Sequence, residues 1–176
     1  LNSIKSLVIE NPNIARRAID LLSDLLRSSL YDKDKDLISI KDELSLVKDY
    51  IELEKMRFEE RLQLEISIDE TLNNLKIPTL SVQLLVENAI KHGIDSKIDG
   101  GIVHLVIEKN VNVIKITVQN PGTLSNNKKP VGLGLKNLQE RLAIQYKGKA
   151  TFSLREIDKE SVVAVITLPI INDEDI

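Results

Sequence analysis

The chain has 176 residues, of which 42% are hydrophobic, and a formal net charge of −3. This size and composition predict a globular protein with a real core, either as one large domain or as two small ones. The acidic balance and an aromatic content of 3% argue against a nucleic-acid or anionic-membrane surface, and the absence of cysteine excludes disulfides, thiolate metal sites and a cysteine nucleophile.

The first third of the chain shows helical periodicity. Pro12 marks a helix start or break, and the pair Ser39 and Asp42 resembles a capping box for a second helix that runs to about Phe58. The charged run 31–36 is predicted to be a solvated connector between them. The apolar stripes are Ile14, Ala18, Leu21, Leu25 and Ile19, Leu22, Leu26, Leu30 in the first helix, and Ile40, Leu44, Val47, Ile51 and Leu46, Tyr50, Leu53 in the second.

Two antiparallel helices that are each apolar on two sides cannot bury both sides alone. Pairing with a second copy into a four-helix bundle would bury them, which predicts a homodimer through this hairpin. The alternative is that the second stripe packs on the rest of the same chain.

After Arg61 the pattern changes to short alternating segments. Strands are predicted at Leu62–Ile68, Ile102–Glu108, Val113–Val118, Ala150–Ile157 and Val162–Leu168, and helices after Pro78 to about His92 and from Gly132 onward. A polar loop, 122–131, separates the third strand from the last helix. The predicted organisation is therefore a helical hairpin at 1–60, an α/β sandwich at 61–170 and an acidic tail at 171–176.

The helix that ends near His92 carries polar groups along one edge. These are Glu87, Asn88, Lys91 and His92, in two pairs spaced by four residues. Asn88 offers a carbonyl oxygen to Mg²⁺, and Lys91 and His92 can neutralise phosphate oxygens. Glu87 can accept a proton or orient a nucleophile. Taken alone, the pattern fits an ordinary amphipathic helix better, with a Glu–Lys pair and a histidine at its C-terminal end.

A second signal favours a nucleotide site. Gly132 and Gly134 stand where a loop becomes a helix, so the backbone can approach a phosphate and present free N–H groups to it. The lysine-bearing loop ahead of them could close as a lid. Asn120, at the end of a strand, could hydrogen-bond a base edge. A turn-forming Asn-Pro-Gly is the simpler alternative for that residue.

The order of these segments resembles the GHKL nucleotide-binding fold. The stretch 86–93 looks like its N box, Asn120 to Gly122 occupies the place of the first glycine box, and Gly132 to Leu135 looks like the second. More closely, residues 1 to about 169 resemble the LytS-like sensor histidine kinases. The stretches that carry this resemblance are 1–4, 22–27, 43–58, 85–93 and 132–142, the last with Asn137 and its Glu-Arg-Leu run.

The resemblance implies an α+β fold: a helical hairpin followed by a mixed sheet covered on one face by helices. It implies transfer of the ATP γ-phosphoryl group to a histidine and then to a response regulator aspartate. ATP and Mg²⁺ would be the cofactors, with Asn88 as the metal ligand and Glu87 as the catalytic residue. The implied cofactor-binding residues are Asn88, Lys91, His92, Asn120, Gly122, Gly132, Gly134, Leu135 and Asn137.

Two departures from the family pattern matter. The His-Phe-Leu-Phe-Asn run that holds the family's acceptor histidine is absent, and neither His92 nor His104 occupies its place, so we expect a fragment that begins just after the acceptor. The first glycine box commonly has Asp where this chain has Asn120.

The resemblance also implies a cytoplasmic domain of a membrane-anchored protein, with the anchor in a missing N-terminal region.

Two alternatives stay open from the sequence. One is a GHKL ATPase of another branch, against which the short lid and the preceding hairpin argue. The other is a non-catalytic, nucleotide-sensing dimerisation module. The presence of both Glu87 and Asn88 favours catalysis, whereas Asn120 leaves room for the non-catalytic alternative.

Overall fold

The computed structural model describes residues 8–31, 36–124 and 132–170. The acidic tail at 171–176 and most of the predicted connector and lid lie outside the described residues. The elements are α2 (Pro12–Tyr31), β1 (Leu37–Ser39), α3 (Ile40–Phe58), η2 (Glu59–Arg61), β2 (Leu62–Ile68), η3 (Glu70–Leu72), β3 (Lys76–Pro78), α4 (Ser81–Ala89), η4 (Ile90–Ile94), β4 (Gly101–Asn110), β5 (Val113–Pro121), α5 (Leu133–Gln145), β6 (Thr151–Asp158) and β7 (Ser161–Pro169).

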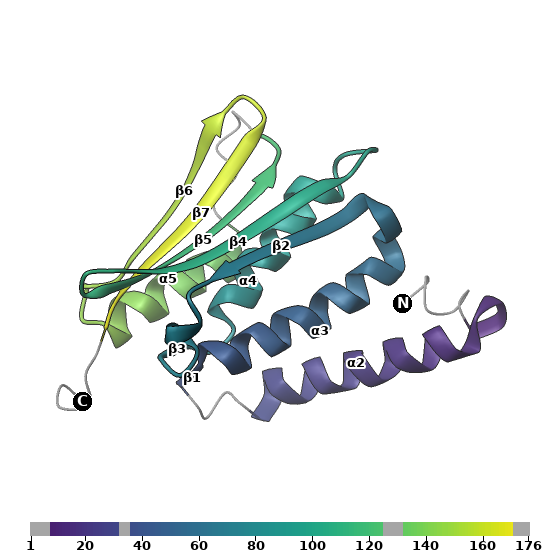
Figure 1. The fold of residues 1–176 in the computed structure, drawn as a ribbon, viewed down its shortest axis with the longest axis horizontal. Helices are drawn as coiled ribbons and strands as arrows, with labels where there is room; N and C mark the ends of the chain where they lie inside the picture. The colour runs from purple at the N-terminus through teal and green to yellow at the C-terminus, as the bar shows by residue number, and fades with distance from the viewer. Residues whose placement is uncertain (1–7, 32–35, 125–131, 171–176) are drawn as a thin grey trace.

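The main sheet has five strands in the order β2-β4-β5-β7-β6. β2 and β4 are parallel, and the other neighbours are antiparallel. Figure 1 shows α3, α4 and α5 on the same side of this sheet, with α2 beyond α3. The prediction of a mixed sheet covered on one face by helices is therefore confirmed.

The predicted strands are present, with small differences at their ends. β5 continues to Pro121 rather than ending at Val118, so Asn120 belongs to the strand. Two strands were missed, β1 and β3, which pair with each other antiparallel through three residues each. Segments this short carry too little alternation to be recognised. Tyr31, assigned to the connector, is the last residue of α2 instead.

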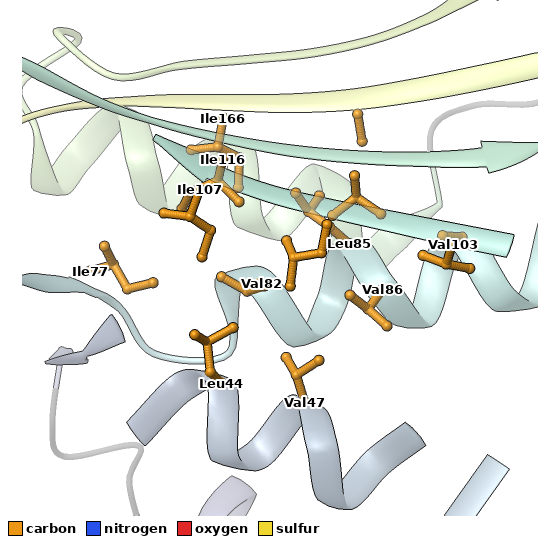
Figure 2. Packing of buried hydrophobic residues seen from close by; sticks show 14 of the residues in the cluster. Leu44, Val47, Ile77, Val82, Leu85, Val86, Val103, Ile107, Ile116 and Ile166 are labelled. Atoms are coloured by element: carbon orange, nitrogen blue, oxygen red, sulfur yellow. The ribbon is translucent and has the colours of Figure 1, made fainter. Parts of the chain in front are cut away.

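One hydrophobic core joins the sheet to the helices (Figure 2). The predicted inner stripe of α3 is confirmed, and these residues belong to the same cluster as the buried faces of α4, β4 and β5: Ile40, Leu44, Val47 and Ile51. Leu44 and Val47 lie near Val82 and Val86 of α4. The second helix of the hairpin thus packs on the rest of the chain, and a domain division near residue 60 stays a prediction.

The packing of α2 is of a different kind. Its buried residues are Ala15, Ala18 and Leu21, whereas Ile14, predicted to share a stripe with Ala18 and Leu21, is 38% exposed. On the second predicted stripe, Ile19 and Leu26 are 50% and 54% exposed. Two residues of the second α2 stripe therefore face outward, as a homodimer through the hairpin would require of this helix.

Candidate nucleotide site between α4 and α5

α4 begins without a side-chain cap of its own. Leu80, the residue before it, has a left-handed backbone with φ of 61°. Val82, Leu85, Val86 and Ala89 are buried, as the apolar face of this helix predicts. The helix was expected to reach about His92, but the α-helical part ends at Ala89 and a π-helical turn, η4, continues to Ile94. Lys91 and His92 therefore lie on this wider turn.

The four residues of the predicted polar edge lie outside the core. Glu87, Lys91 and His92 are exposed, and Asn88 is half-buried. Glu87 also lies near α3, because its negative charge acts on two α3 side chains. Burial raises the pKa of Glu54, opposed by Arg57 and supported by Asp95 and Glu87. Burial likewise raises the pKa of Tyr50, with further contributions from Glu54 and Glu87.

Close packing joins the end of α4 to the end of β5. A Cβ atom added to Gly93 would lie 2.5 Å from Asn120 Nδ2 and 2.7 Å from the Pro121 carbonyl oxygen, so only glycine fits there. Asn120 is 6% exposed, and its Nδ2 donates to the Pro121 carbonyl at 2.8 Å. Gly122 has φ of +140°, and its N–H donates to the Glu160 carbonyl at 2.7 Å. The segment that resembles the first glycine box is thus a tightly packed corner beside η4.

α5 presents the beginning of a helix to the same region. Gly132 is its N-cap, no side chain caps it, and its first turn contains no acid. Gly134 packs against α4, because a Cβ atom there would lie 3.0 Å from Leu84 Cδ1. The Leu135 side chain is buried in the core, so only its backbone could meet a ligand, which narrows the predicted role of this residue.

A cavity of about 380 Å³ lies between α4 and α5. The residues that line it are Leu80, Gln83, Leu84 and Glu87 of the α4 side, and Gly134, Asn137, Leu138 and Arg141 of α5. Three predicted site residues meet here: Glu87, Gly134 and Asn137. Asn88, Lys91 and His92 follow along α4 and η4 toward Asn120, and do not line this cavity.

Sequence reasoning missed two polar residues of the cavity, Gln83 and Arg141. Gln83 Oε1 and Arg141 Nε are buried without a hydrogen-bond partner among the described residues. Burial lowers the pKa of Arg141, although Glu43 and Asp36 favour its charged form. Arg141 lies two helical turns after Gly134, and this spacing could have placed it on the α5 face that meets α4.

The second histidine of the chain lies outside the region between α4 and α5. His104 alternates with the buried Val103 and Leu105 of β4 and so lies on the face of the sheet away from the helices, with Nδ1 3.0 Å from Glu65 Oε2. The described residues contain no group of three or more His, Cys, Asp or Glu side chains that could hold a metal ion. No helix in the described part of the chain is long and apolar enough to cross a membrane.

Comparison with known proteins gives the family. Residues 1–62 match the family described as Histidine kinase. The chain is 37% identical over 156 residues to the sensor histidine kinase YpdA of Escherichia coli, covering 83% of this chain and 27% of that protein. It is 26% identical to the sensor protein LytS of Enterococcus faecalis, covering 99% of this chain and 32% of that protein. It belongs to the LytS-like sensor histidine kinase family. The chain spans about a third or less of these relatives.

Solved structures agree on the fold of this histidine kinase chain. The catalytic domain of histidine kinase ThkA covers 76% of it with a TM-score of 0.57 and 14% identity, and the alignment includes 94% of the ThkA chain. Histidine kinase AdeS of Acinetobacter baumannii covers 96% of it with a TM-score of 0.58 and 16% identity, over 84% of the AdeS chain. At these identities the likeness establishes the fold alone.

Proposed function

We propose that this chain is the catalytic, ATP-binding part of a sensor histidine kinase. The observation that carries the proposal is the meeting of α4 and α5 around one cavity. An uncapped helix start without acidic residues stands on the α5 side, and Glu87 stands on the α4 side. A helix N-terminus favours phosphate because its first N–H groups are unpaired and its dipole is positive there.

The residues present suit Mg²⁺ together with a triphosphate. Mg²⁺ usually takes one or two protein oxygens and completes its shell with phosphate oxygens and water, so a single amide oxygen from Asn88 is enough. Lys91 and His92 would contact phosphate oxygens, while Asn120 and Gly122 would border the base. Bound Mg²⁺ would neutralise negative charge on the phosphates. Gly132, Gly134 and the Leu135 N–H would face the phosphates, with Asn137 beside them.

Glu87 is the proposed catalytic residue. Its carboxylate lies at the cavity and beside α3, where it can hold or accept the proton of an incoming histidine. We propose that this histidine lies upstream of Leu1. His92 belongs to the nucleotide edge and His104 to the outer sheet face beside Glu65.

The wider assembly is part of the proposal. A homodimer would form through the outward stripe of α2, and the phosphoryl group would pass to a response regulator. A solved complex of histidine kinase ThkA with response regulator protein TrrA, whose kinase chain matches with a TM-score of 0.55, supports this kind of partner. A membrane anchor would lie in an N-terminal region before this chain.

Titration calorimetry with ATP, in Mg²⁺ and in EDTA, tests the proposal. The parent chain should bind ATP more tightly with Mg²⁺. Asn88→Ala should reduce that Mg²⁺-dependent gain on the order of tenfold, which is about 1.4 kcal/mol. Asn112→Ala, at an exposed asparagine in the β4–β5 turn, is the matched control and should bind like the parent. A parent chain that binds no ATP would refute the nucleotide site, and an unchanged gain in Asn88→Ala would refute its metal role.

A further inference from the structure

Glu43 of α3 is the one charged residue among those described that is fully buried. Its Oε2 accepts from the Leu80 N–H at 2.8 Å, and its Oε1 accepts from the Val82 N–H at 2.8 Å and the Gln83 N–H at 3.1 Å. Leu80 is the residue before α4, and Val82 and Gln83 belong to its first turn, where the N-cap residue supplies no side-chain cap. A carboxylate from one helix therefore caps another, and the three hydrogen bonds offset part of its desolvation.

The amide groups that Glu43 holds belong to the wall of the cavity between α4 and α5. Leu80 and Gln83 line that cavity together with Glu87. Arg141 of α5 lines it from the opposite side and favours the charged form of Glu43. Glu43 thus lies behind the α4 wall and interacts electrostatically with the α5 wall.

We propose that Glu43 is a positioning residue for phosphoryl transfer, which sets where Glu87 and Asn88 stand relative to α5. This proposal rests on the nucleotide site proposed above. Gln83 and Glu87 are one turn apart on a short helix, and a helix transmits a displacement of its first turn along its axis. A misplacement of ~1 Å at a reacting group can lower a rate by ~100-fold. A cap that merely stabilised the fold would have no such effect on the site.

Two variants and a control separate these roles. Glu43→Gln keeps the shape but turns one acceptor oxygen into a donor, which faces a backbone N–H. Glu43→Asp keeps the charge and both oxygens but is one methylene shorter. Glu52→Gln is the control, because Glu52 is a carboxylate of the same helix whose two hydrogen bonds come from Arg17 of α2.

Amide hydrogen exchange and ATP titration are measured on the same proteins, below their unfolding temperature. Exchange at Leu80, Val82 and Gln83 should quicken in Glu43→Gln and stay at the parent rate in Glu52→Gln. The Kd for ATP with Mg²⁺ should rise about tenfold in Glu43→Gln, while the Kd in EDTA changes less than about twofold. Glu43→Asp should fall between the parent and Glu43→Gln in both measurements.

The outcomes are distinct. Faster exchange with an unchanged Mg²⁺-dependent Kd would overturn the proposal, since Glu43 would then be only a cap, while the nucleotide site would stand. A parent chain that binds no ATP would remove the proposed function itself. Should Glu43→Gln fail to fold, Glu43→Asp decides by the same criterion: a Kd ratio between Mg²⁺ and EDTA equal to that of the parent overturns the positioning role.

Discussion

α3 contacts a helix on each side, and the two contacts differ in kind. Toward α4 it buries large aliphatic side chains and a carboxylate that accepts three backbone N–H groups. Toward α2 the buried residues are Ala15, Ala18 and Leu21, which lie outside the main core cluster. There the polar link is the Arg17–Glu52 pair, with two bonds of 2.7 Å and both side chains about half exposed.

The difference bears on which helices belong to the unit that carries the proposed nucleotide site. Large buried surfaces and satisfied buried polar groups make a contact rigid, whereas an exposed ion pair contributes little and is screened by salt. α3 therefore behaves as part of the unit that carries the proposed nucleotide site, and α2 as a helix attached to it. The two helices of this hairpin are continuous in sequence, but only α3 is part of the main hydrophobic core.

Deleting one helix or two should have the largest effect. A chain that starts at Asp36 keeps α3 and should unfold cooperatively. A chain that starts at Leu62 loses the α3 part of the core and the cap of α4, so we expect no cooperative transition in calorimetry. Cooperative unfolding of the shorter chain at the temperature of the longer one would contradict this comparison and would support a division near residue 60.

Substitution of Glu43 should have an intermediate effect that depends on pH. Glu43→Gln leaves a buried N–H without its acceptor, which costs about 1–3 kcal/mol of unfolding free energy. Burial raises the pKa of Glu43 above its ordinary value, against three backbone hydrogen bonds and Arg141. Protonation of Glu43 therefore stabilises the folded state. This stabilisation is complete below the ordinary carboxyl pKa and is lost as the pH rises through the raised pKa of the folded state. The cost of Glu43→Gln in urea unfolding should shrink with rising pH, and a cost that grows would contradict the burial argument.

Substitution of Glu52 should have the smallest effect and the opposite pH dependence. The hydrogen bond from Arg17 lowers the pKa of Glu52, so the contribution of this pair is present above the ordinary carboxyl pKa and is lost as pH falls through the lowered value. Glu52→Gln should lower the unfolding midpoint slightly at neutral pH and low salt. In high salt the midpoints of parent and variant should coincide, and a difference that persists there would mean that the pair is more than an exposed ion pair.

Elements with a regular hydrophobic pattern or a local capping motif were predictable from the sequence. The strands of the main sheet and the inner stripe of α3 follow from local periodicity. The Ser39 cap, which accepts from the Asp42 N–H at 3.1 Å, follows from a short capping motif. The strands β1 and β3 were not predictable, because each has only three residues and so shows no periodicity. The polar edge of α4 was predicted as a set, but the π-helical turn that carries Lys91 and His92 depends on packing against β5.

The missed residues of the site depend on contacts between distant segments. Glu43 follows Ile40 by three residues and precedes Leu44, so it lies on the buried face of an amphipathic helix. A carboxylate on such a face needs a partner, and this was the available signal. The partner is the backbone at the start of α4, where Gln83 follows Glu43 by 40 residues. Backbone N–H groups have no signature in a sequence.

The parallel pairing of β2 with β4 has a consequence for the order of folding. β4 with β5, and β6 with β7, are antiparallel neighbours in sequence and need only short turns to form. β2 meets β4 only after the segment from Asp69 to Gly100 has crossed over, and such long closures are slow. During synthesis α3 emerges long before these strands, because chains grow from the N-terminus. Its apolar face and the Glu43 carboxylate therefore stay in water at least until α4, some forty residues later, has been made, and during this interval the growing chain is most exposed to aggregation.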